Sequence, residues 1–241
     1  MSAMGRFMFS AVLGWFAAAL SIALMWPQVW RSCVLRRTAG LSPTATWLGF
    51  ALPVGWVEYG LLIDDPVQIY TNTVGAGAGI AVLVALLAAR AELRQRRFGA
   101  RAAVGAAVLL SATALTAGLA SLPGGEHRTL ASVLGMVLTV AVVLANVPQP
   151  LALLRDRRQD LSGVSGLRWV LASAANLSWA AYAYSLGQGA VLVCSLTGLA
   201  CSLVVCTVLV SARRQRAVPP VAASAVASVP RAADQLAVAA A

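Results

Sequence analysis

Lysine is missing from this 241-residue chain, in which all 18 basic residues are arginine. A Schiff base with retinal or pyridoxal phosphate and a phosphate-loop motif all need lysine, so these chemistries are excluded. His127 is the only histidine and falls in a loop that we expect to be solvated, which excludes a histidine-rich metal site. The four cysteines show no disulfide or zinc spacing. We therefore expect no cofactor, no metal site and no enzymatic activity.

Charged side chains are also scarce. They make up 11% of the chain, whereas a soluble domain carries roughly 25%. Hydrophobic residues make up 60% of the chain, and the mean hydropathy is +0.81. This composition is typical of a protein that crosses a membrane several times.

Long apolar runs predict an all-α membrane protein, because about 20 apolar residues in a helix span a bilayer. The run 169–212 is long enough for two spans and contains a turn at Gly187-Gln188-Gly189. A β-barrel would instead show alternating segments of about ten residues. Seven transmembrane helices are predicted, at about 7–30, 44–63, 66–89, 101–122, 129–152, 167–186 and 190–211.

Arginine is unevenly distributed between the two sides that these spans define. Sixteen arginines fall on one side, and only Arg6 and Arg128 fall on the other. The positive-inside rule makes the arginine-rich side cytoplasmic, with the N-terminus outside the plasma membrane and the C-terminus inside. We expect the basic loops to contact anionic lipids rather than nucleic acid. The segment 213–241, rich in Ala, Val and Pro, is expected to be a disordered cytoplasmic tail.

One pattern occurs twice along the chain. Trp26-Pro27-Gln28 ends the first predicted helix and Val147-Pro148-Gln149 ends the fifth. Each is followed by an arginine-bearing loop and a Gly-x-Ser motif, at 40–42 and at 163–165. An offset of 123 residues maps Trp56 onto Trp179, Tyr59 onto Tyr182 and Gly75 onto Gly198. The repeat predicts two parallel three-helix units, 1–91 and 127–212, joined by a basic loop and linker helix at 92–126.

These Pro-Gln pairs, basic loops and Gly-x-Ser motifs, with the aromatic span that follows each, resemble the PQ-loop family. The three-one-three layout is similar to that of the SWEET sugar transporters and of the half-length bacterial SemiSWEETs. The resemblance covers about 7–211. It implies alternating access of a small polar solute to a site between the two units.

Prolines stand near the predicted cytoplasmic helix ends, where a missing backbone donor loosens the preceding turn. In the SWEET family such prolines are seen as hinges of the inner gate. The resemblance assigns this role to Pro27, Pro43 and Pro148, with Gly166 at the fourth place. Gln28 and Gln149 could cap the carbonyls freed by the hinges. The alternative is that the prolines only begin or end helices.

Trp56 and Asn72 are 16 residues apart across a short turn, so we expect them to lie at similar depth. An indole gives a flat face for a sugar ring, and an amide gives hydroxyl groups both a donor and an acceptor. A tryptophan and an asparagine at these places line the substrate site in the SWEET family. The second unit offers Trp179 and Ser195, with Asn176 as a further amide. The competing interpretation makes the asparagines contacts between helices.

Glu58 is the one acidic residue inside a predicted span. Because an intramembrane carboxylate is costly to insert, it is a functional candidate, and a neutral form favoured by burial could couple transport to protons. A gate role is an equal alternative, because Glu58 lies near the outer end of its helix. Tyr59 and Asp65 follow it and resemble the outer gate of SemiSWEETs.

Gly75, Gly77 and Gly79 lie inside an apolar helix with no strand before them, which excludes a nucleotide-binding loop. Gly75 and Gly79 have the small-x-x-x-small spacing that lets two helices approach closely.

The function expected from these features is alternating-access transport of a neutral sugar by facilitated diffusion. A proton-coupled amino-acid carrier that uses Glu58 is the alternative within transport. The competing class is a non-transporting receptor or scaffold with the same architecture, which a plugged central pathway would favour. Association into homo-oligomers stays open.

Overall fold

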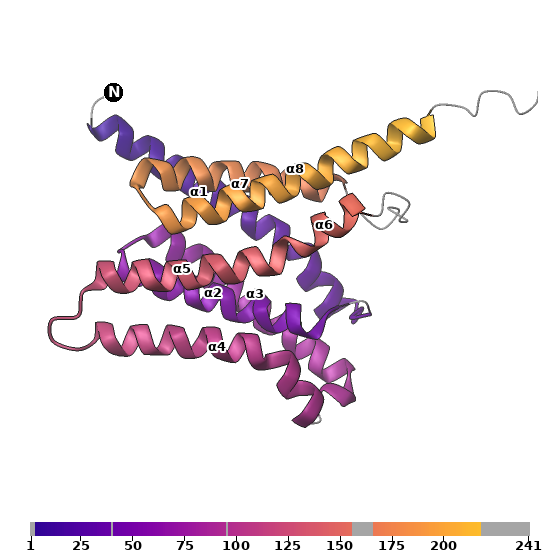
Figure 1. Cartoon of the computed structure of the whole chain (residues 1–241), viewed down its shortest axis with the longest axis horizontal. Helices are drawn as coiled ribbons and strands as arrows, with labels where there is room; N and C mark the ends of the chain where they lie inside the picture. Colours follow the sequence, from indigo (N-terminus) through magenta and orange to yellow (C-terminus); the bar gives the residue numbers. More distant parts are fainter. Residues whose placement is uncertain (1–2, 40, 95, 156–165, 218–241) are drawn as a thin grey trace, which may run out of the picture.

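The computed structural model describes residues 3–39, 41–94, 96–155 and 166–217, and this part of the chain is helical without strands. Figure 1 shows the arrangement of the helices. In chain order the elements are α1 (Ala3–Val29), a π-helical turn η1 (Trp30–Val34), α2 (Pro43–Leu62), α3 (Pro66–Ala89), a 3₁₀ turn η2 (Ala91–Arg94), α4 (Arg96–Ala120), α5 (His127–Asn146), α6 (Pro148–Arg155), α7 (Gly166–Leu186) and α8 (Gly189–Ala217). An all-helical architecture is confirmed.

Helices suited to a membrane account for much of this bundle. Over the described residues, five segments are long and apolar enough to cross a bilayer: Met8–Val34, Pro66–Ala89, Phe98–Ala120, His127–Asn146 and Gly189–Ser211. α2 and α7 contain 20 and 21 residues, about the length of α5, which is one of these five segments. Large apolar side chains such as Val12, Leu115 and Leu144 are exposed on the outside of the bundle, as a lipid-facing surface requires.

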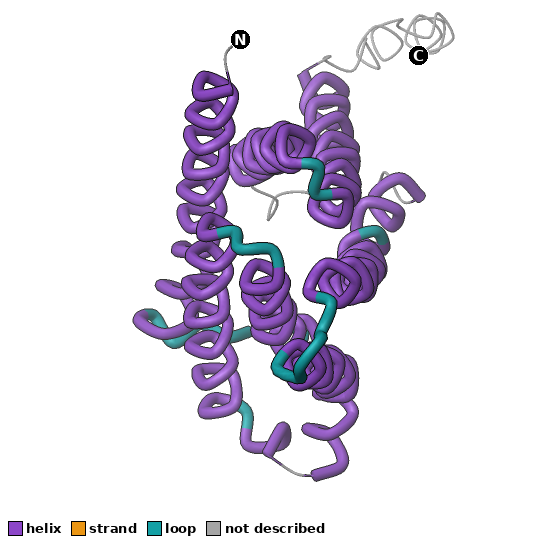
Figure 2. Tube along the Cα trace, turned by 90° about the vertical axis from the view of Figure 1, so that its left-hand side faces the viewer, coloured by secondary structure: helices purple, strands orange, loops and turns teal. Residues whose placement is uncertain are grey.

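Short turns gather at one end of the bundle. The α2–α3, α4–α5 and α7–α8 turns lie at the left of Figure 1, and Figure 2 shows them in teal, facing the viewer. The start of α1 lies at this end, and the last residues of α8 lie at the opposite end. We call the end with the three turns the outer end and the opposite end the inner end.

Two predicted helices are interrupted near the inner end. The first, predicted over 7–30, continues from α1 into the η1 turn just after Pro27. The fifth, predicted as continuous over 129–152, stops at Asn146, and α6 begins at Pro148. Proline lacks the N–H that would continue the hydrogen-bond ladder, so the interruptions follow each Pro-Gln pair.

Gln28 Nε2 donates to Ser32 Oγ at 2.8 Å, so at least one of its two N–H groups pairs with a hydroxyl group of the π-helical turn. Capping of a carbonyl by Gln28 stays a prediction. The side chain of Gln149 lies outside the described part. The second Gly-x-Ser motif, at 163–165, also falls outside the described residues.

Each helix of the α2–α3 hairpin begins with proline after a capping side chain. Ser42 Oγ accepts from Ala45 N at 3.4 Å before Pro43, and Asp65 Oδ1 accepts from Val67 N at 2.9 Å before Pro66. Proline fits the first position of a helix, where its missing N–H costs nothing. These sequences therefore fix where both helices start.

Helix packing is closest where small residues meet. A Cβ atom added to Gly79 would collide with the backbone of Gly49 and Phe50 in α2, so the predicted close approach at this glycine is confirmed. Gly75 lies in ordinary contact with Pro53, with 3.4 Å from a built Cβ to Pro53 Cβ. Van der Waals packing of this kind, rather than exclusion of water, associates helices in lipid.

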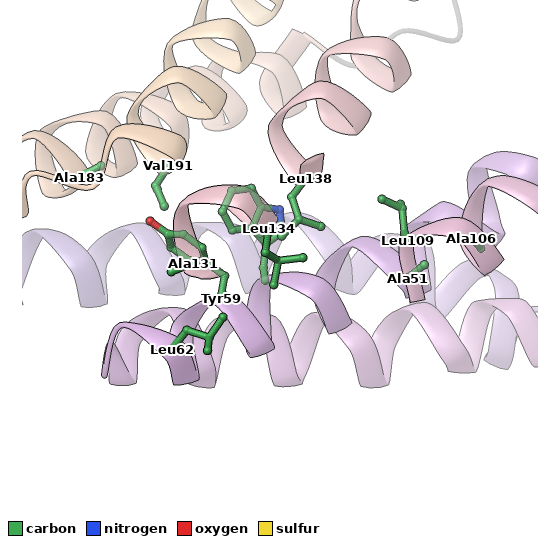
Figure 3. Packing of buried hydrophobic residues seen from close by; sticks show 11 residues of the cluster. Ala51, Tyr59, Leu62, Ala106, Leu109, Ala131, Leu134, Leu138, Ala183 and Val191 are labelled. Carbon is green, nitrogen blue, oxygen red and sulfur yellow. The ribbon is translucent and has the colours of Figure 1, made fainter. Parts of the chain in front are cut away.

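The largest group of buried residues joins five helices at the centre of the bundle. Figure 3 shows Leu134 and Leu138 of α5 close to Tyr59 of α2. The cluster consists of Ala51, Trp56, Tyr59, Leu62, Ala106, Leu109, Ala131, Leu134, Leu138, Ala183 and Val191. It holds α5 against α2, α4 and α8.

The last helix is longer than predicted. α8 continues to Ala217, beyond the expected end at 211, so the first residues of the tail predicted at 213–241 are helical. The apolar run of α8 leads directly into an arginine-rich segment with no glycine or proline to stop it. Residues 218–241, the rest of that tail, lie outside the described residues.

Candidate functional site

A cavity of about 260 Å³ lies between α1, α2, α3, α7 and α8. All five residues predicted to bind the substrate line it, namely Trp56, Asn72, Asn176, Trp179 and Ser195. The other lining residues are Ser21, Met25, Pro53, Gln68, Thr71, Gly75, Val191 and Cys194. None of these lining side chains carries a charge, and the groups they offer for polar or stacking contacts in this central cavity are two indoles, three amides, hydroxyl groups and the thiol of Cys194.

Two tryptophan–tyrosine pairs stand at the outer boundary of the central cavity. Trp56 meets the edge of Tyr59 with ring centroids 5.2 Å apart, and Trp179 meets the edge of Tyr182 at 5.7 Å. Such edge-to-face contacts contribute about 0.5–1.5 kcal/mol beyond burial. The two pairs hold both indoles in the same way.

Each of these tyrosines packs on a glycine of another helix. A Cβ added to Gly135 of α5 would lie 2.9 Å from Tyr59 Cε2, and one added to Gly14 of α1 would lie 2.6 Å from Tyr182 Cε2. Both contacts exclude a larger residue at the glycine. The rings therefore close the space between α1 and α7 and between α2 and α5.

The two indole N–H groups differ in their partners. Trp179 Nε1 donates to Ser21 Oγ at 2.9 Å, and Ser21 Oγ in turn donates to the carbonyl of Ala17. Among the described residues, no acceptor pairs with Trp56 Nε1. Trp56 can therefore offer a donor to a solute, whereas Trp179 offers mainly its ring face.

The asparagines anchor themselves on their own helices. Asn72 Nδ2 donates to Gln68 O and to Gln68 Oε1, both at 2.9 Å, and Asn176 Nδ2 donates to Ala172 O at 2.8 Å. Asn176 also packs directly against Gly198. Over the described part of the chain, neither Asn72 Oδ1 nor Asn176 Oδ1 accepts a hydrogen bond, so both oxygens remain acceptors for a solute.

A second, larger cavity of about 1520 Å³ lies at the outer end. Its lining includes Trp15, Tyr59, Asp65, His127, Tyr182 and Gln188. The turns between α2 and α3 and between α7 and α8 contribute to its wall. Tyr59 and Tyr182 line the outer cavity and contact Trp56 and Trp179, which line the central cavity, so the two aromatic pairs lie between the cavities.

Asp65 connects the two sides of the bundle between these cavities. Its side chain is 4% exposed and accepts from Val67 N and Gln68 N of its own helix at 2.9 and 3.1 Å. It also accepts from Tyr182 Oη at 2.8 Å and from Gln188 Nε2 at 2.7 Å. We call these two contacts to the α7–α8 hairpin the outer lock.

Gln188 is held in one orientation by the outer lock. Because a carboxylate only accepts, the amide end that faces Asp65 must be Nε2. The other end, Oε1, is buried and has no partner among the described residues. A buried acceptor of this kind is usually satisfied by water, so the lock can accept one more donor.

The three residues predicted for the outer gate or coupling separate in space. Asp65 and Tyr59 line the outer cavity, but the hydroxyl that bonds Asp65 belongs to Tyr182. Glu58 lines neither of the two cavities. It is half-buried, and the imidazole of His127 is close enough to act on its carboxyl group electrostatically.

The predicted hinge residues lie at the inner ends of helices. Pro27 precedes the η1 turn, Pro43 begins α2, and Pro148 begins α6. Gly166, at the fourth place, begins α7. These positions are compatible with hinges and equally with helix starts and stops.

Four residues that make hydrogen bonds in the site were not among the predicted site residues. They are Ser21, Gln68, Tyr182 and Gln188. The repeat did carry a signal for two of them, because the 123-residue offset pairs Tyr182 with Tyr59 and Gln188 with Asp65. Nothing in the sequence distinguishes Ser21 or Gln68 from other polar residues in apolar helices.

Comparison with known proteins agrees with this geometry. A solved structure of a eukaryotic SWEET transporter superimposes with a TM-score of 0.67, covering 86% of this chain and 99% of that chain at 12% sequence identity. The chain has a SWEET-like fold. No family model matches the chain, and no curated protein matches it in sequence.

At this identity the SWEET-like fold describes how the chain is folded and leaves its solute undetermined. The superposition extends over nearly all of the SWEET chain. The protein is thus a helical membrane protein of SWEET-like fold with a polar cavity between its helices.

Proposed function

We propose that the protein transports a neutral, sugar-sized solute across a membrane by alternating access. The observation that carries this proposal is the uncharged central cavity, lined by two tryptophans and two asparagines. Drug-sized ligands occupy about 300–1,000 Å³, so a cavity of about 260 Å³ suits a smaller solute such as a monosaccharide. Sugar rings stack on indoles, and their hydroxyls pair with amides.

The proposed moving parts are two copies of a three-helix unit, with α4 as the linker. The first copy is α1, α2 and α3, and the second is the interrupted helix α5–α6 followed by α7 and α8. Helix contacts inside the first unit recur inside the second: α2 packs on α3 as α7 packs on α8, and α1 packs on α3 as α5 packs on α8. Between the units, α1 packs on α7 as α5 packs on α2. The glycines that contact Tyr59 and Tyr182 also correspond. They are Gly135 and Gly14, which are 121 residues apart, the same offset as that between the two Pro-Gln pairs. Such parallel repeats place a site on the axis between them.

The outer lock supplies the proposed outer gate. Asp65 belongs to the first unit, and its partners Tyr182 and Gln188 belong to the second, so their hydrogen bonds hold the units together above the central cavity. Opening toward the outer end requires these bonds to break. On this proposal the structure is closed on the outer side, and the arginine-rich inner end faces the cytoplasm of a cell whose plasma membrane holds the protein.

The alternatives are less well supported. A proton-coupled amino-acid carrier needs a titratable group at the solute, and Glu58 lines neither cavity. A receptor or scaffold needs no central pathway, whereas this protein has a polar cavity on the inner side of Tyr59 and Tyr182.

The test is uptake of labelled solutes by proteoliposomes that contain the full-length protein. Sugars and amino acids are offered with and without an imposed pH gradient. Sugar uptake that does not depend on the gradient supports the proposal. Uptake of amino acids driven by the gradient replaces it with the proton-coupled carrier, and no uptake of any solute by folded protein favours the receptor or scaffold.

A further inference from the structure

The two walls of the central cavity that correspond in the repeat differ in polarity. α3 presents Gln68, Thr71 and Asn72, and the 123-residue offset puts Val191, Cys194 and Ser195 at the matching places of α8. All six line the cavity. One wall is therefore rich in amides, while the other is mostly apolar and ends in a single hydroxyl group.

The contacts of Gln68 determine how its carboxamide points. A backbone carbonyl only accepts, so the atom of Asn72 that lies 2.9 Å from Gln68 O is Nδ2. The same nitrogen lies 2.9 Å from the Gln68 side chain, whose facing atom must therefore be Oε1. The other end of Gln68 is Nε2, which carries two N–H donors.

This arrangement leaves a donor and an acceptor side by side. Both N–H groups of Asn72 are used on Gln68, so Asn72 offers only Oδ1. Within the described ranges no group accepts from Gln68 Nε2, although the side chain is 3% exposed and lines the cavity. Because the described protein groups give this amide N–H no acceptor, water or a solute in the cavity is what remains to accept from it.

We propose that Gln68 is a solute-recognition residue, and that the Gln68–Asn72 pair binds neighbouring hydroxyl groups along one edge of the solute. Gln68 Nε2 donates to one hydroxyl oxygen, and Asn72 Oδ1 accepts from the next hydroxyl. The opposite edge of the solute lies against Val191 and is apolar. The inference rests on the proposed function and narrows its substrate class to neutral polyols with hydroxyls on one edge, such as deoxyhexoses.

Two variants separate recognition from mere support of Asn72. Gln68→Met keeps the length of the side chain and removes both its donors and its acceptor. Gln68→Glu keeps an oxygen that faces Asn72 Nδ2 but replaces the donors with a second oxygen. A residue that only positions Asn72 tolerates Gln68→Glu, whereas a residue that donates to the solute does not.

The experiment measures uptake by proteoliposomes that hold the full-length protein. The probes are D-glucose and D-galactose and their derivatives that lack one hydroxyl at position 2, 3, 4 or 6. We expect at least one deoxy derivative to be taken up with lower KM than its parent, and removal of the hydroxyl bound by Gln68 to raise KM roughly tenfold. In the Gln68→Met variant, a sugar that lacks the hydroxyl bound by Gln68 should have the same KM as its parent sugar, because the amide donor is already absent.

Val191→Gln is the matched variant on the opposite wall. It adds an amide at the place that corresponds to Gln68 in the second unit. We expect it to abolish the preference for the deoxy derivative, because the missing hydroxyl would now find a partner. Retention of fold is checked for every variant by its elution as a monodisperse species in detergent.

Several results would overturn the inference. One is that, in the unmodified protein, removal of each hydroxyl from the sugar raises KM by the same factor. This measurement needs no variant. Another is a Gln68→Glu protein with unchanged KM, which would make Gln68 a positioning residue only. These results would leave sugar transport intact, whereas no uptake or binding of any neutral sugar by the folded protein would overturn both the inference and the proposed function.

Discussion

Replacing Tyr182 with phenylalanine removes one hydroxyl group from the outer lock and leaves the ring in place. The lost bond is that from Tyr182 Oη to Asp65 Oδ1, at 2.8 Å. A hydrogen bond to a charged group contributes about 1.5–3 kcal/mol, and each 1.4 kcal/mol is a factor of ten. The equilibrium should therefore shift toward the outer-open state by a factor of about 10 to 150.

Cys194 provides a reporter for this shift, because it lines the central cavity below the lock. The other cysteines, Cys33, Cys201 and Cys206, are replaced by serine, and a membrane-impermeant thiol reagent is added from the outer side. If opening is fast compared with labelling, the labelling rate follows the population of the open state. We expect Tyr182→Phe to raise this rate at least tenfold.

Tyr59→Phe is the matched control. Tyr59 has the same edge contact with a tryptophan and the same kind of glycine seat as Tyr182. Its hydroxyl has no hydrogen-bond partner in the part of the chain that the structure describes, so its removal should leave the rate of Cys194 labelling nearly unchanged. Equal rates in Tyr182→Phe and the unmodified protein, or equal increases in the two variants, would refute the lock.

Three further predictions follow from the same structure. Gly79→Ala should destabilise the protein by about 1–3 kcal/mol, because the added Cβ would collide with the backbone of α2. Gly77→Ala is the control and should be neutral or slightly stabilising, because open space surrounds Gly77. Thermal unfolding in detergent compares the two variants. Gln188→Glu should open the outer end at neutral pH, because two carboxylates would then face each other at Asp65. Acidification should close it again as the pair shares a proton, so Cys194 labelling should slow as pH falls. Ser21→Ala should raise KM for the solute about threefold to tenfold, because the indole of the second unit loses its hydrogen bond.

The helices and the cavity-lining residues could be predicted from the sequence because both follow from local regularities. Continuous apolar runs fix the long helices, and a prolyl residue after each capping side chain fixes where α2 and α3 begin. The equal depth of Trp56 and Asn72 follows from their spacing across a tight turn, and the structure brings both to one cavity with Trp179. Whether these residues bind a solute stays a prediction.

The interruptions after the two Pro-Gln pairs could be predicted only in part. Proline signals a break, but whether the chain continues as a π-helical turn or starts a new helix depends on what packs nearby. η1 lies against α3, and α6 lies against α8. These contacts join segments far apart in the sequence, which periodicity does not describe.

The partners of Asp65 could not be predicted from the aligned repeat alone. An offset identifies residues that occupy equivalent places in the two units, and the prediction that Tyr59 and Asp65 act together rests on their resemblance to the outer gate of SemiSWEETs. Near the axis that relates the two units, however, a residue of one unit contacts residues of the other unit. Asp65 therefore bonds Tyr182, which corresponds to Tyr59, and it also meets its own counterpart Gln188.

This proximity to the axis also explains why the two units cannot be identical at the lock. Asp65 Oδ2 and Gln188 Nε2 are 2.7 Å apart, and a second carboxylate at that distance would repel the first in a site shielded from water. An amide at position 188 turns the same contact into a hydrogen bond. The reasoning extends to the central cavity, whose lining combines polar residues of α3 with mostly apolar residues of α8. At both places the two units carry different residues at corresponding positions, Asp65 and Gln188 at the lock and Gln68 and Val191 in the cavity. Gln188→Glu and Val191→Gln make the two units more alike at these positions and are therefore the most informative substitutions.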